Sequence, residues 1–515
     1  MKFTPPRFPY RKPPGLAGSE TRKKAIIVGA GPIGLSMSIE LANYGIPCVL
    51  VDDNDTVSIG SRAICWSKRS LELFDRFGIG DKAVEKGVTW KVGRTFHRDK
   101  ELFSFDLLPD EGHKRPAFIN LQQYYVEAFL VERAMEIPEI DIRFRNKVVD
   151  VQDRGDHVNA RIRTPDGDYC LEAEFLVACD GIRSTVRSVL GLELSGEKFE
   201  ERFLIADIEM KAEFPSERRF WFEPPFHNGQ SALLHKQPDD IYRIDLQLGP
   251  DADQDEERQP AKVVPRIEKV VGHSNFRLEW VSVYTFQCRR LERFVHGRVI
   301  FAGDSAHVVS PFGARGGNGG LQDVDCLGWK LAAVIEGRSP VSLLDSFDAE
   351  RTYAADENIL QSTRTTKFMS PPRGIKKLAR NALLKLAAMS SRVRPWVNSG
   401  CLSVPCVYSS EAADDPDLPE FARPGAVALD APQKSGWLID RLGKTPVVLG
   451  VGCNPPRIEG AMSLTVDMNE FIRKRYLGSQ RKAIYLVRPD QVVHARWKNP
   501  SRSDIQRSLE MMWGL

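Results

Sequence analysis

The sequence predicts an α/β fold, α+β overall, in which a helix-flanked parallel sheet is interleaved with a mostly antiparallel sheet and followed by a smaller α/β unit. Three observations predict this arrangement. Apolar runs at 25–28 and 48–51 flank a helical pattern from Pro32 to about Tyr44, and a strand–helix–strand unit places its strands parallel and adjacent. Between about 200 and 290, runs such as 242–248 alternate in polarity, which is typical of half-buried antiparallel strands. After about residue 410, three further strand-like runs suffice for a small α/β domain.

Composition restricts the class of protein. Of the 515 residues, 42% are apolar and 27% are charged, which is ordinary for a globular protein. The net charge is only +3, so bulk charge gives no support for a nucleic-acid partner. Nine cysteines are too few for a disulfide scaffold, and no apolar run reaches the roughly 18 to 20 residues of a membrane span. We therefore expect a soluble, cytoplasmic protein.

The first segment of the chain, residues 1–23, is rich in proline and in basic residues. Its five prolines cannot donate backbone hydrogen bonds, so no regular element is expected. No apolar stretch follows the basic residues, which argues against a secretory signal. The segment is predicted to be a flexible tail.

The turn after the first strand has the form Gly-x-Gly-x-x-Gly. Gly29 permits a tight turn, Gly31 lets a pyrophosphate approach the backbone, and Gly34 allows close helix packing. The pyrophosphate would lie at the helix N-terminus, where free N–H groups favour an anion. Asp52 ends the second strand and can accept hydrogen bonds from a ribose. The predicted dinucleotide-binding residues of this Rossmann-like unit are Gly29, Gly31, Pro32, Ile33, Gly34, Asp52 and Asp53.

Two later turns follow buried strands in the same way. The first begins at Asp180-Gly181 after an apolar strand at 175–178, and by itself it reads as a surface turn with two arginines. The second begins at Gly303-Asp304, and a glycine-rich run at 311–320 then opens a helix. Glycines at a helix start leave N–H groups bare for a ligand. The predicted binding residues here are Asp180, Gly181, Arg183, Gly303, Asp304, Pro311, Gly316, Gly317 and Asn318.

These three segments, in this order and spacing, resemble the single-component flavoprotein aromatic hydroxylases, the class A flavin monooxygenases. The resemblance covers roughly residues 24–360. It implies that the first motif binds the ADP half of FAD, and that the Asp180 motif touches FAD and serves NAD(P)H use. It also implies that Gly303 and Asp304 bind the ribityl chain, with the Pro311–Asn318 loop beside the isoalloxazine ring. Arg62 and Gln123 match the family's mobile-flavin arginine and an FAD-contacting glutamine.

The resemblance also implies the reaction. NADH or NADPH reduces FAD and leaves, O2 forms a flavin C4a-hydroperoxide, and one oxygen atom is passed to a phenol, ortho or para to its hydroxyl. Side chains cannot perform this redox chemistry, so the cofactor must carry it. The sequence does not distinguish NADH from NADPH. Arg62 and the helix start at 316–318 would stabilise negative charge on the reduced flavin.

The C-terminal region resembles the thioredoxin-like domain of the phenol hydroxylase and 3-(3-hydroxyphenyl)propionate hydroxylase branches. Its marks are 423–425, 436–438 and 486–490. Cys453 is its only cysteine, so the domain should not be redox-active. The fold class is thus a Rossmann-like FAD-binding domain of the 4-hydroxybenzoate hydroxylase type, a substrate sheet and a thioredoxin-like domain. The predicted ranges are 24–90, 120–200 and 290–400 for FAD binding, 91–119 and 201–289 for the substrate sheet, and 410–515 for the C-terminal domain.

Catalytic residues are harder to predict, because a group that takes the phenol proton has no fixed motif. The predicted catalytic residues are Arg62, Pro311, His235 and Arg243, and His227, Tyr242 and Asp245 are further candidates for the base. Gln237 stands where 4-hydroxybenzoate hydroxylases use an arginine for the substrate carboxylate, which argues against that substrate, and Arg243 matches a second arginine near the flavin. His307 is expected to support its loop, and no metal site is predicted.

Several alternatives stay open at this point. The flavin could serve an epoxidase or a hydroxylase of a polycyclic, biosynthetic substrate. A flavin-bound redox sensor that uses the C-terminal domain to bind a partner is a rival from another class. The expected partners are a small phenolic substrate and O2, with no nucleic acid and no membrane span, and a homodimer is the assembly considered. A helix is predicted near 374–390, packing through Ile375, Leu378, Ala382 and Leu386, with a membrane-surface helix as the alternative.

Overall fold

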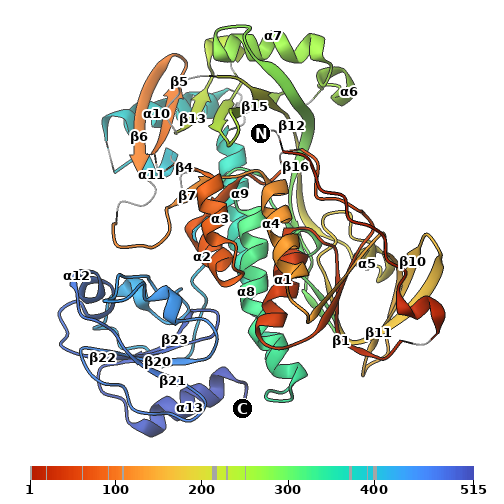
Figure 1. The fold of residues 1–515 in the computed structure, drawn as a ribbon. Coiled ribbons are helices and arrows are strands. Elements are labelled where there is room, and N and C mark those ends of the chain that lie inside the picture. Colours follow the sequence, from red (N-terminus) through yellow and green to blue (C-terminus); the bar gives the residue numbers. More distant parts are fainter. Residues whose placement is uncertain are drawn as a thin grey trace.

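A computed structural model describes residues 3–18, 20–60, 62–90, 92–106, 110–211, 217–227, 230–249, 251–369, 374–390, 392–397 and 403–515. Ser61 and Cys401 lie outside the described residues. Two large sheets share the body of the molecule, and a third sheet forms a separate unit at the C-terminal end (Figure 1). The body therefore holds one interleaved pair of sheets, as the fold class predicts.

The first sheet is the parallel one. β1 runs parallel to β2 and to β11, β2 to β8, and β11 to β18. The strand–helix–strand prediction at its start is confirmed, since α1 (Pro32–Asn43) joins β1 to β2. The strands in spatial order are β17 (Val295–His296), β18 (Val299–Phe301), β11 (Gly167–Ala178), β1 (Lys23–Val28), β2 (Cys48–Asp52) and β8 (Ile140–Phe144), and β9 (Lys147–Asp153) and β10 (Val158–Thr164) extend β11 as an antiparallel ribbon.

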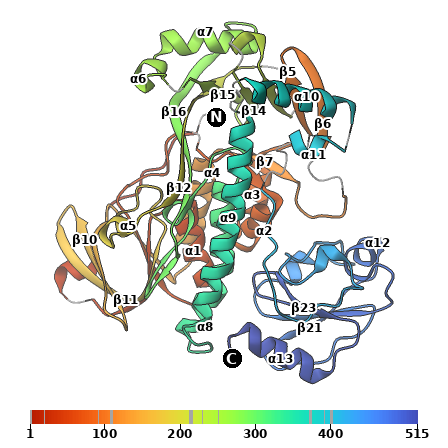
Figure 2. The ribbon, with the colours of Figure 1, turned by 180° about the vertical axis from the view of Figure 1, so that it is seen from behind.

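Helices cover this sheet, and the central one is α8 (Gly316–Ile335), which is buried without interruption from Asn318 onwards. It packs on α1 because glycines remove side chains at the contact: a Cβ on Gly320 would lie 2.7 Å from Ile33 Cδ1. The long helix α9 runs along α8 (Figure 2). The other body helices are α2 (Lys68–Arg76), α3 (Gly80–Lys86), α4 (Gln123–Met135), α5 (Thr185–Val189), α9 (Leu343–Met369), α10 (Ile375–Met389) and α11 (Arg394–Val397).

The second sheet has two very different faces. On one face the side chains of Leu234, Tyr242 and Ile244 form an apolar cluster with α7 (Pro260–Val271). The other face looks toward the parallel sheet and carries most of the polar residues described below. In spatial order the strands are β19 (His307–Val308), β16 (Arg277–Arg290), β12 (Ser195–Glu209), β15 (Ile241–Leu248), β14 (Ala232–Lys236), β13 (Arg218–Phe222), β5 (Val92–His97) and β6 (Lys100–Asp106).

The C-terminal unit has the strand order of a thioredoxin-like core. β20 (Val447–Val451) is parallel to β21 (Met462–Thr465) and antiparallel to β22 (Ala483–Val487), and β23 (Val493–Trp497) leads to α13 (Arg502–Met512). Between β20 and β21 the chain is irregular and contains no helix. Smaller elements are the sheet β3 (Cys65–Ser67), β7 (Phe118–Asn120) and β4 (Val88–Trp90), and the short helices α6 (Gln254–Glu257) and α12 (Glu470–Ile472).

Two sequence expectations need correction. Residues 3–18 are not a flexible tail: Phe8 N donates to Asp55 O at 2.8 Å, its ring stacks on Phe144, and Pro14–Ala17 form a 3₁₀ turn. The helix at 374–390 exists as α10, but it packs through Leu384 and Ala387, while the predicted contacts Ile375, Leu378, Ala382 and Leu386 are exposed. The periodicity gave the helix correctly and its buried side wrongly. Among the described residues, no helix is long and apolar enough to cross a membrane.

Candidate active site

The three predicted turns meet at one edge of the parallel sheet. They follow β1, β11 and β18, which are neighbours, and parallel strands end at the same edge. Cys179 N donates to Val28 O at 2.8 Å, and Ala302 N donates to Ala178 O at 3.1 Å. A Cβ on Gly29 would lie 2.6 Å from Cys179 O, so only glycine lets these turns approach. Segments that lie far apart in the chain thus meet at one edge of the sheet, which we call the cofactor cleft.

The first turn leaves backbone donors free at the start of α1. The first helical hydrogen bond runs from Leu35 N to Gly31 O, so the N–H groups of Ile33 and Gly34 have no partner within the helix. A Cβ on Gly31 would meet no atom within 4 Å, whereas one on Gly34 would overlap the carbonyl oxygen of Gly29. The two glycines therefore differ: Gly34 serves packing, and Gly31 borders open space where a phosphate fits.

Asp52 and Asp53 lie at the end of β2. The Asp52 carboxylate accepts hydrogen bonds from Ala30 N at 2.6 Å and from Asn54 N at 2.8 Å, and burial raises its pKa. It braces the glycine turn and keeps lone pairs for a ribose hydroxyl. Asp53 is exposed and faces Lys147 at 3.5 Å. Of the two predicted acids, Asp52 has the geometry of a ribose ligand.

The second turn is tied to the third by a side chain outside the predicted set. Arg187 donates to Ser305 O at 3.0 Å. Asp180 accepts from Val186 N at 3.1 Å, while its Oδ1 is buried without a partner among the described residues, and burial raises its pKa. Gly181 borders open space and Arg183 is exposed. An orphaned buried oxygen beside the cleft is what a hydroxyl-bearing ligand would satisfy.

Asp304 has the environment expected of a residue that lines a cleft. Its side chain is exposed to solvent, yet surrounding protein raises the pKa of the carboxyl through burial, with Arg62 and His307 opposing that shift. Asp304 thus combines an exposed carboxylate with surroundings that disfavour its charge. Among the described residues no hydrogen bond engages its carboxylate, so its acceptors are available for sugar-chain hydroxyls.

A buried charge network supports this turn from below. Asp323, on α8, accepts from Gly303 N at 2.8 Å and from His307 Nε2 at 2.7 Å, and Arg351 Nε donates to it at 2.7 Å. Burial disfavours the charged carboxylate, but His307, Arg351 and the Gly303 amide outweigh that effect and lower the pKa of Asp323 to about 2. His307 therefore supports its loop, as its isolation in the sequence indicated.

The start of α8 faces the same cleft. The first helical bond is Gly319 N to Arg315 O at 2.7 Å, which leaves the N–H groups of residues 316–318 without helical partners. The side chain of Asn318 is used internally, since it accepts from Ser67 N and donates to Cys65 O, both at 2.9 Å. Only its backbone is available to a ligand. Pro311 is exposed, and its carbonyl, which accepts from Ala314 N at 3.0 Å, keeps a second lone pair.

Arg62 lies on a segment clamped from both sides. Gln123 Oε1 accepts from Ala63 N at 3.2 Å, and Arg243 Nη1 donates to Arg62 O at 2.9 Å. Gly60 lies against the indole of Trp280, where any Cβ would clash. Arg243 thus binds the backbone of the segment that carries Arg62, and the second sheet thereby contacts the cofactor cleft.

The inner face of the second sheet carries a polar row across its strands. The pairs His235–Arg243, Arg243–Asp207 and Asp207–Trp280 are directly opposite each other, and the register of Arg219 with Leu234 places Arg218 opposite His235. Opposite residues share a face, so all five side chains point the same way. His235 is buried with Nδ1 unpartnered among the described residues, and burial together with Arg218 and Arg243 lowers its pKa well below the usual value.

An aromatic pocket continues this row toward the loop at Pro311. One of its walls is Phe312 and Gly313, next to the glycine-rich start of α8. Phe220 and Phe222, on β13, are part of its lining. The residues around it are Arg94, Thr95, Phe105, Arg218, Phe220, Phe222, Phe312, Gly313, Thr365, Met369 and Val397.

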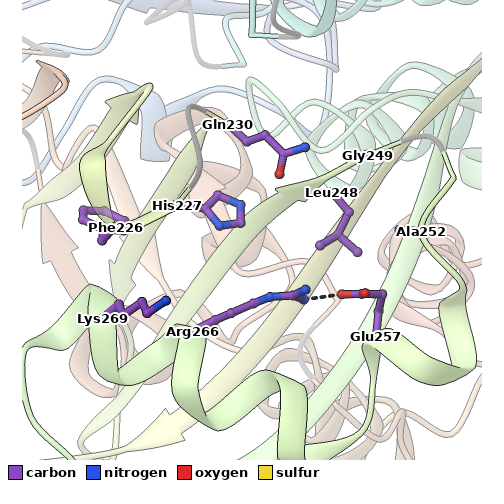
Figure 3. A pocket seen from close by; sticks show the side chains of 9 residues that line it. All are labelled: Phe226, His227, Gln230, Leu248, Gly249, Ala252, Glu257, Arg266 and Lys269. Carbon is purple, nitrogen blue, oxygen red and sulfur yellow. Dashed lines mark hydrogen bonds and ion pairs between the residues drawn. The ribbon is translucent and has the colours of Figure 1, made fainter.

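A second pocket lies on the opposite, α7 side of the sheet (Figure 3). His227 lines it and donates from Nε2 to Gln247 O at 2.6 Å, while Arg266 pairs with Glu257 across it. Tyr242 also faces α7. Neither residue reaches the cleft at the Pro311 loop, so His227 and Tyr242 are excluded as the base by position.

One cluster has the residue types of a metal site. Cys326, Glu350 and Asp490 bring ligand atoms within 4.8 Å of one another at the contact with the C-terminal unit. Arg488 binds both carboxylates, and Lys330 adds a contact to Glu350 at 3.0 Å. The carboxylates are already neutralised by cations of the chain, so this cluster fastens the C-terminal unit to the body and carries no metal prediction.

Comparison with known proteins agrees with this geometry. The family model described as "FAD binding domain" matches residues 22–362. The chain belongs to this family. A "flavin-dependent monooxygenase" of Mycobacteroides abscessus is 32% identical over 64% of this chain and 71% of that protein. A "3-(3-hydroxy-phenyl)propionate/3-hydroxycinnamic acid hydroxylase" of Mycobacterium sp. is 27% identical over 87% and 79%.

The solved structures give the same fold. The flavin-dependent monooxygenase PieE, in complex with FAD and substrate, superposes with a TM-score of 0.80 at 21% identity, covering 96% of this chain and 98% of that one. The protein is an FAD-dependent monooxygenase with the α/β fold that the sequence predicts. The free amides at 33–34 and 316–318, the open side of Gly31, and the unengaged acceptors of Asp180 and Asp304 fit FAD along the cleft.

Several residues of this site were not predicted. Asp323 and Arg351 lie inside helices, where charged residues normally face solvent, and Trp280 and Arg218 lie in strands with no motif. Asp323 lies in a helix that also contains Asp325 and Lys330, so an acid in this helix did not by itself single it out. The sequence offers no signal for Arg218, because the adjacent residue, Arg219, is also an arginine and its side chain points to the opposite face of the strand.

Proposed function

We propose that this monooxygenase hydroxylates a phenolic aromatic substrate, ortho or para to its hydroxyl, with NADH or NADPH and O2 as co-substrates. The observation that carries the proposal is the aromatic pocket beside Phe312 and Gly313. Phe220, Phe222 and Phe312 give the pocket apolar aromatic walls of the kind that favour a flat ring, and Phe312 and Gly313 place it next to the glycine-rich segment that precedes α8. The hydroxyphenyl substrate in the name of a curated relative supports the same choice.

The residues of the cleft divide the work. FAD, when bound, supplies electron transfer and oxygen activation, which no side chain of the chain can provide. The amides at 316–318 and the charge of Arg62 stabilise negative charge that develops beside them. Asp304, Asp180 and Asp52 accept hydrogen bonds from cofactor hydroxyls, and the Pro311 carbonyl accepts one from the substrate hydroxyl. The aromatic walls keep water from the reacting ring.

Arg243 and Gln123 are positioning residues in this scheme. Each holds the backbone around Arg62, one from the second sheet and one from α4. The segment can change position only if these two hydrogen bonds break or shift. A link between substrate entry at the sheet and the placement of Arg62 follows from that arrangement.

Purified protein tests the proposal directly. It should carry FAD, and a panel of phenols should accelerate NAD(P)H oxidation and yield a product heavier by one oxygen atom. Colourless protein that takes up no FAD contradicts the cofactor. Flavin reduction accelerated by an alkene or a polycyclic compound but by no phenol would favour epoxidation or a biosynthetic hydroxylation instead. Slow, substrate-insensitive oxidation with a stable protein complex would favour a sensor.

We also propose a cellular location and an oligomeric state for this protein. A cytoplasmic location is checked by fractionation of the source cells, and a homodimer by the mass of the holoprotein in solution.

A further inference from the structure

We infer that Arg218 recognises an anionic group of the substrate, so that the protein selects phenols that carry a carboxylate. The inference rests on the proposed function, because it assigns a second recognition point in the same pocket. Arg218 is the first residue of β13 and lines the pocket together with Phe220, Phe222 and Phe312. It lies at the end of the polar row, opposite His235.

The charge of the Arg218 guanidinium is the observation on which this inference rests. Among the described residues no hydrogen bond or ion pair engages it, although it lies deep enough for burial to lower its pKa. Its side chain keeps partial solvent access through the pocket. A buried cation without a counter-ion is strongly unfavourable, and proteins keep one where a ligand completes the pair.

The charged residues near Arg218 do not supply it with a counter-ion. Arg243, two strands away from Arg218 in the row, binds Asp245 at 2.7 Å and is further attracted by Asp207. His235 lies between the two arginines and stays neutral at ordinary pH, because burial and the two cations lower its pKa. Asp245 therefore attracts Arg218 only at longer range. The nearby carboxylates serve Arg243, and Arg218 faces the pocket with its donors free.

The other arginine at this pocket shows the contrast. Arg94 is bound by Glu217 at 2.6 Å and by Glu101 at 2.9 Å, so its charge is already balanced. Among the described residues that line this pocket, Arg218 is thus the cation that a carboxylate entering between the phenylalanines would neutralise. Guanidinium binds carboxylate through two parallel hydrogen bonds, which also fixes the orientation of the ring. Arg218 would thus hold one end of the substrate while the hydroxyl end points toward the Pro311 loop.

Binding to the holoenzyme tests this inference without turnover. Calorimetric titration with benzoate, phenylacetate and 3-phenylpropionate, none of which has a phenol hydroxyl, should show binding of at least one. Arg218→Met should raise the Kd of that ligand on the order of 50-fold, as expected for a lost charge-assisted pair. Arg218→Lys should stay within about 10-fold of the wild type. Arg219→Met is the matched control, an adjacent arginine on the other face, and should change Kd by less than about twofold.

Turnover gives the second readout. The wild type should prefer 3-(3-hydroxyphenyl)propionate to the neutral 3-propylphenol, and in Arg218→Met the ratio of kcat/KM for these two substrates should fall toward one. Absence of binding by all three carboxylates, or equal affinity in Arg218→Met, overturns the inference. If no phenol gains oxygen but the carboxylates still require Arg218, the proposed function fails and the anion subsite stands.

Discussion

The cofactor cleft and the inner face of the second sheet contact each other through Arg62 and Arg243, but they are built from different parts of the chain. The cleft is made of backbone: glycine turns after three parallel strands expose amides and leave room for a ligand. The sheet face is made of side chains that cross-strand register brings into one row. The comparison shows that a site built from backbone depends on glycines, which lack a side chain. A site built from side chains depends on which strands pair and so on which residues become neighbours.

The largest effect on stability and on FAD content should come from a methyl group added at Gly34, the glycine that packs against backbone. In Gly34→Ala the new Cβ overlaps the carbonyl oxygen of Gly29, and backbone must move. We expect a loss of about 3 kcal/mol or more of unfolding free energy and little FAD in the purified protein. Thermal unfolding and flavin content measure both.

Gly31→Ala is the matched control for this change. Its Cβ would meet no protein atom within 4 Å, so the apoprotein should unfold at the wild-type temperature. The methyl group occupies the side open to a phosphate, so FAD affinity should fall by about tenfold or more. Equal effects of the two alanines on apoprotein stability would contradict a backbone-built cleft.

Asp304 should show the next largest effect, on FAD alone. Its carboxylate lies in the cleft and is engaged by no hydrogen bond among the described residues, so Asp304→Ala should leave the fold intact. Losing a charged acceptor for ligand hydroxyls should weaken FAD binding on the order of 10- to 100-fold. Flavin release on dilution, measured by fluorescence, gives the constant. An unchanged FAD affinity in Asp304→Ala would remove Asp304 from the site. The FAD affinity of Asp304→Asn should lie between those of the wild type and Asp304→Ala.

The same contrast explains what the sequence could predict. Glycine spacing reports a turn directly, so the three segments and most of the cleft were found without a structure. A strand pattern reports which side chains share a face of one strand, but not which strands become neighbours. His235 and Arg243 could therefore be chosen, but Tyr242 and His227 looked equally suitable. Arg218 was missed, because only its pairing beside His235 distinguishes it from Arg219.

The support under the cleft should show a smaller effect, on stability. Asp323 has a pKa lowered to about 2, so its charge stabilises the fold fully above about pH 4, and that contribution is lost as pH falls from about 4 to about 2. Asp323→Asn should lose about 2 to 4 kcal/mol at pH 7, since Arg351 keeps a buried charge without its partner. Urea unfolding measures the difference, which should shrink toward zero near pH 2.

Asp345→Asn serves as the control for that series, because its side chain is exposed and its contact with Arg293 is long. Exposed pairs contribute little, so no loss above about 0.5 kcal/mol is expected at any pH. A difference between wild type and Asp323→Asn that stays constant down to pH 2 would show that packing, rather than charge, supports the turn.

The smallest effect should come from His235, and it tests the sheet face most sharply. Burial and the neighbouring Arg218 and Arg243 lower the pKa of this imidazole well below its usual value, so it is neutral at pH 7 and above. Its protonation therefore cannot shape a rate profile in that range. His235→Gln should reduce kcat/KM by less than about fivefold and leave its pH dependence unchanged, with His227→Gln, on the far face, as the control. If the pH profile of kcat/KM showed a transition near pH 6.5 that disappeared only in His235→Gln, the arginines beside His235 would carry less positive influence than we infer. The case for an unpaired Arg218 would then weaken.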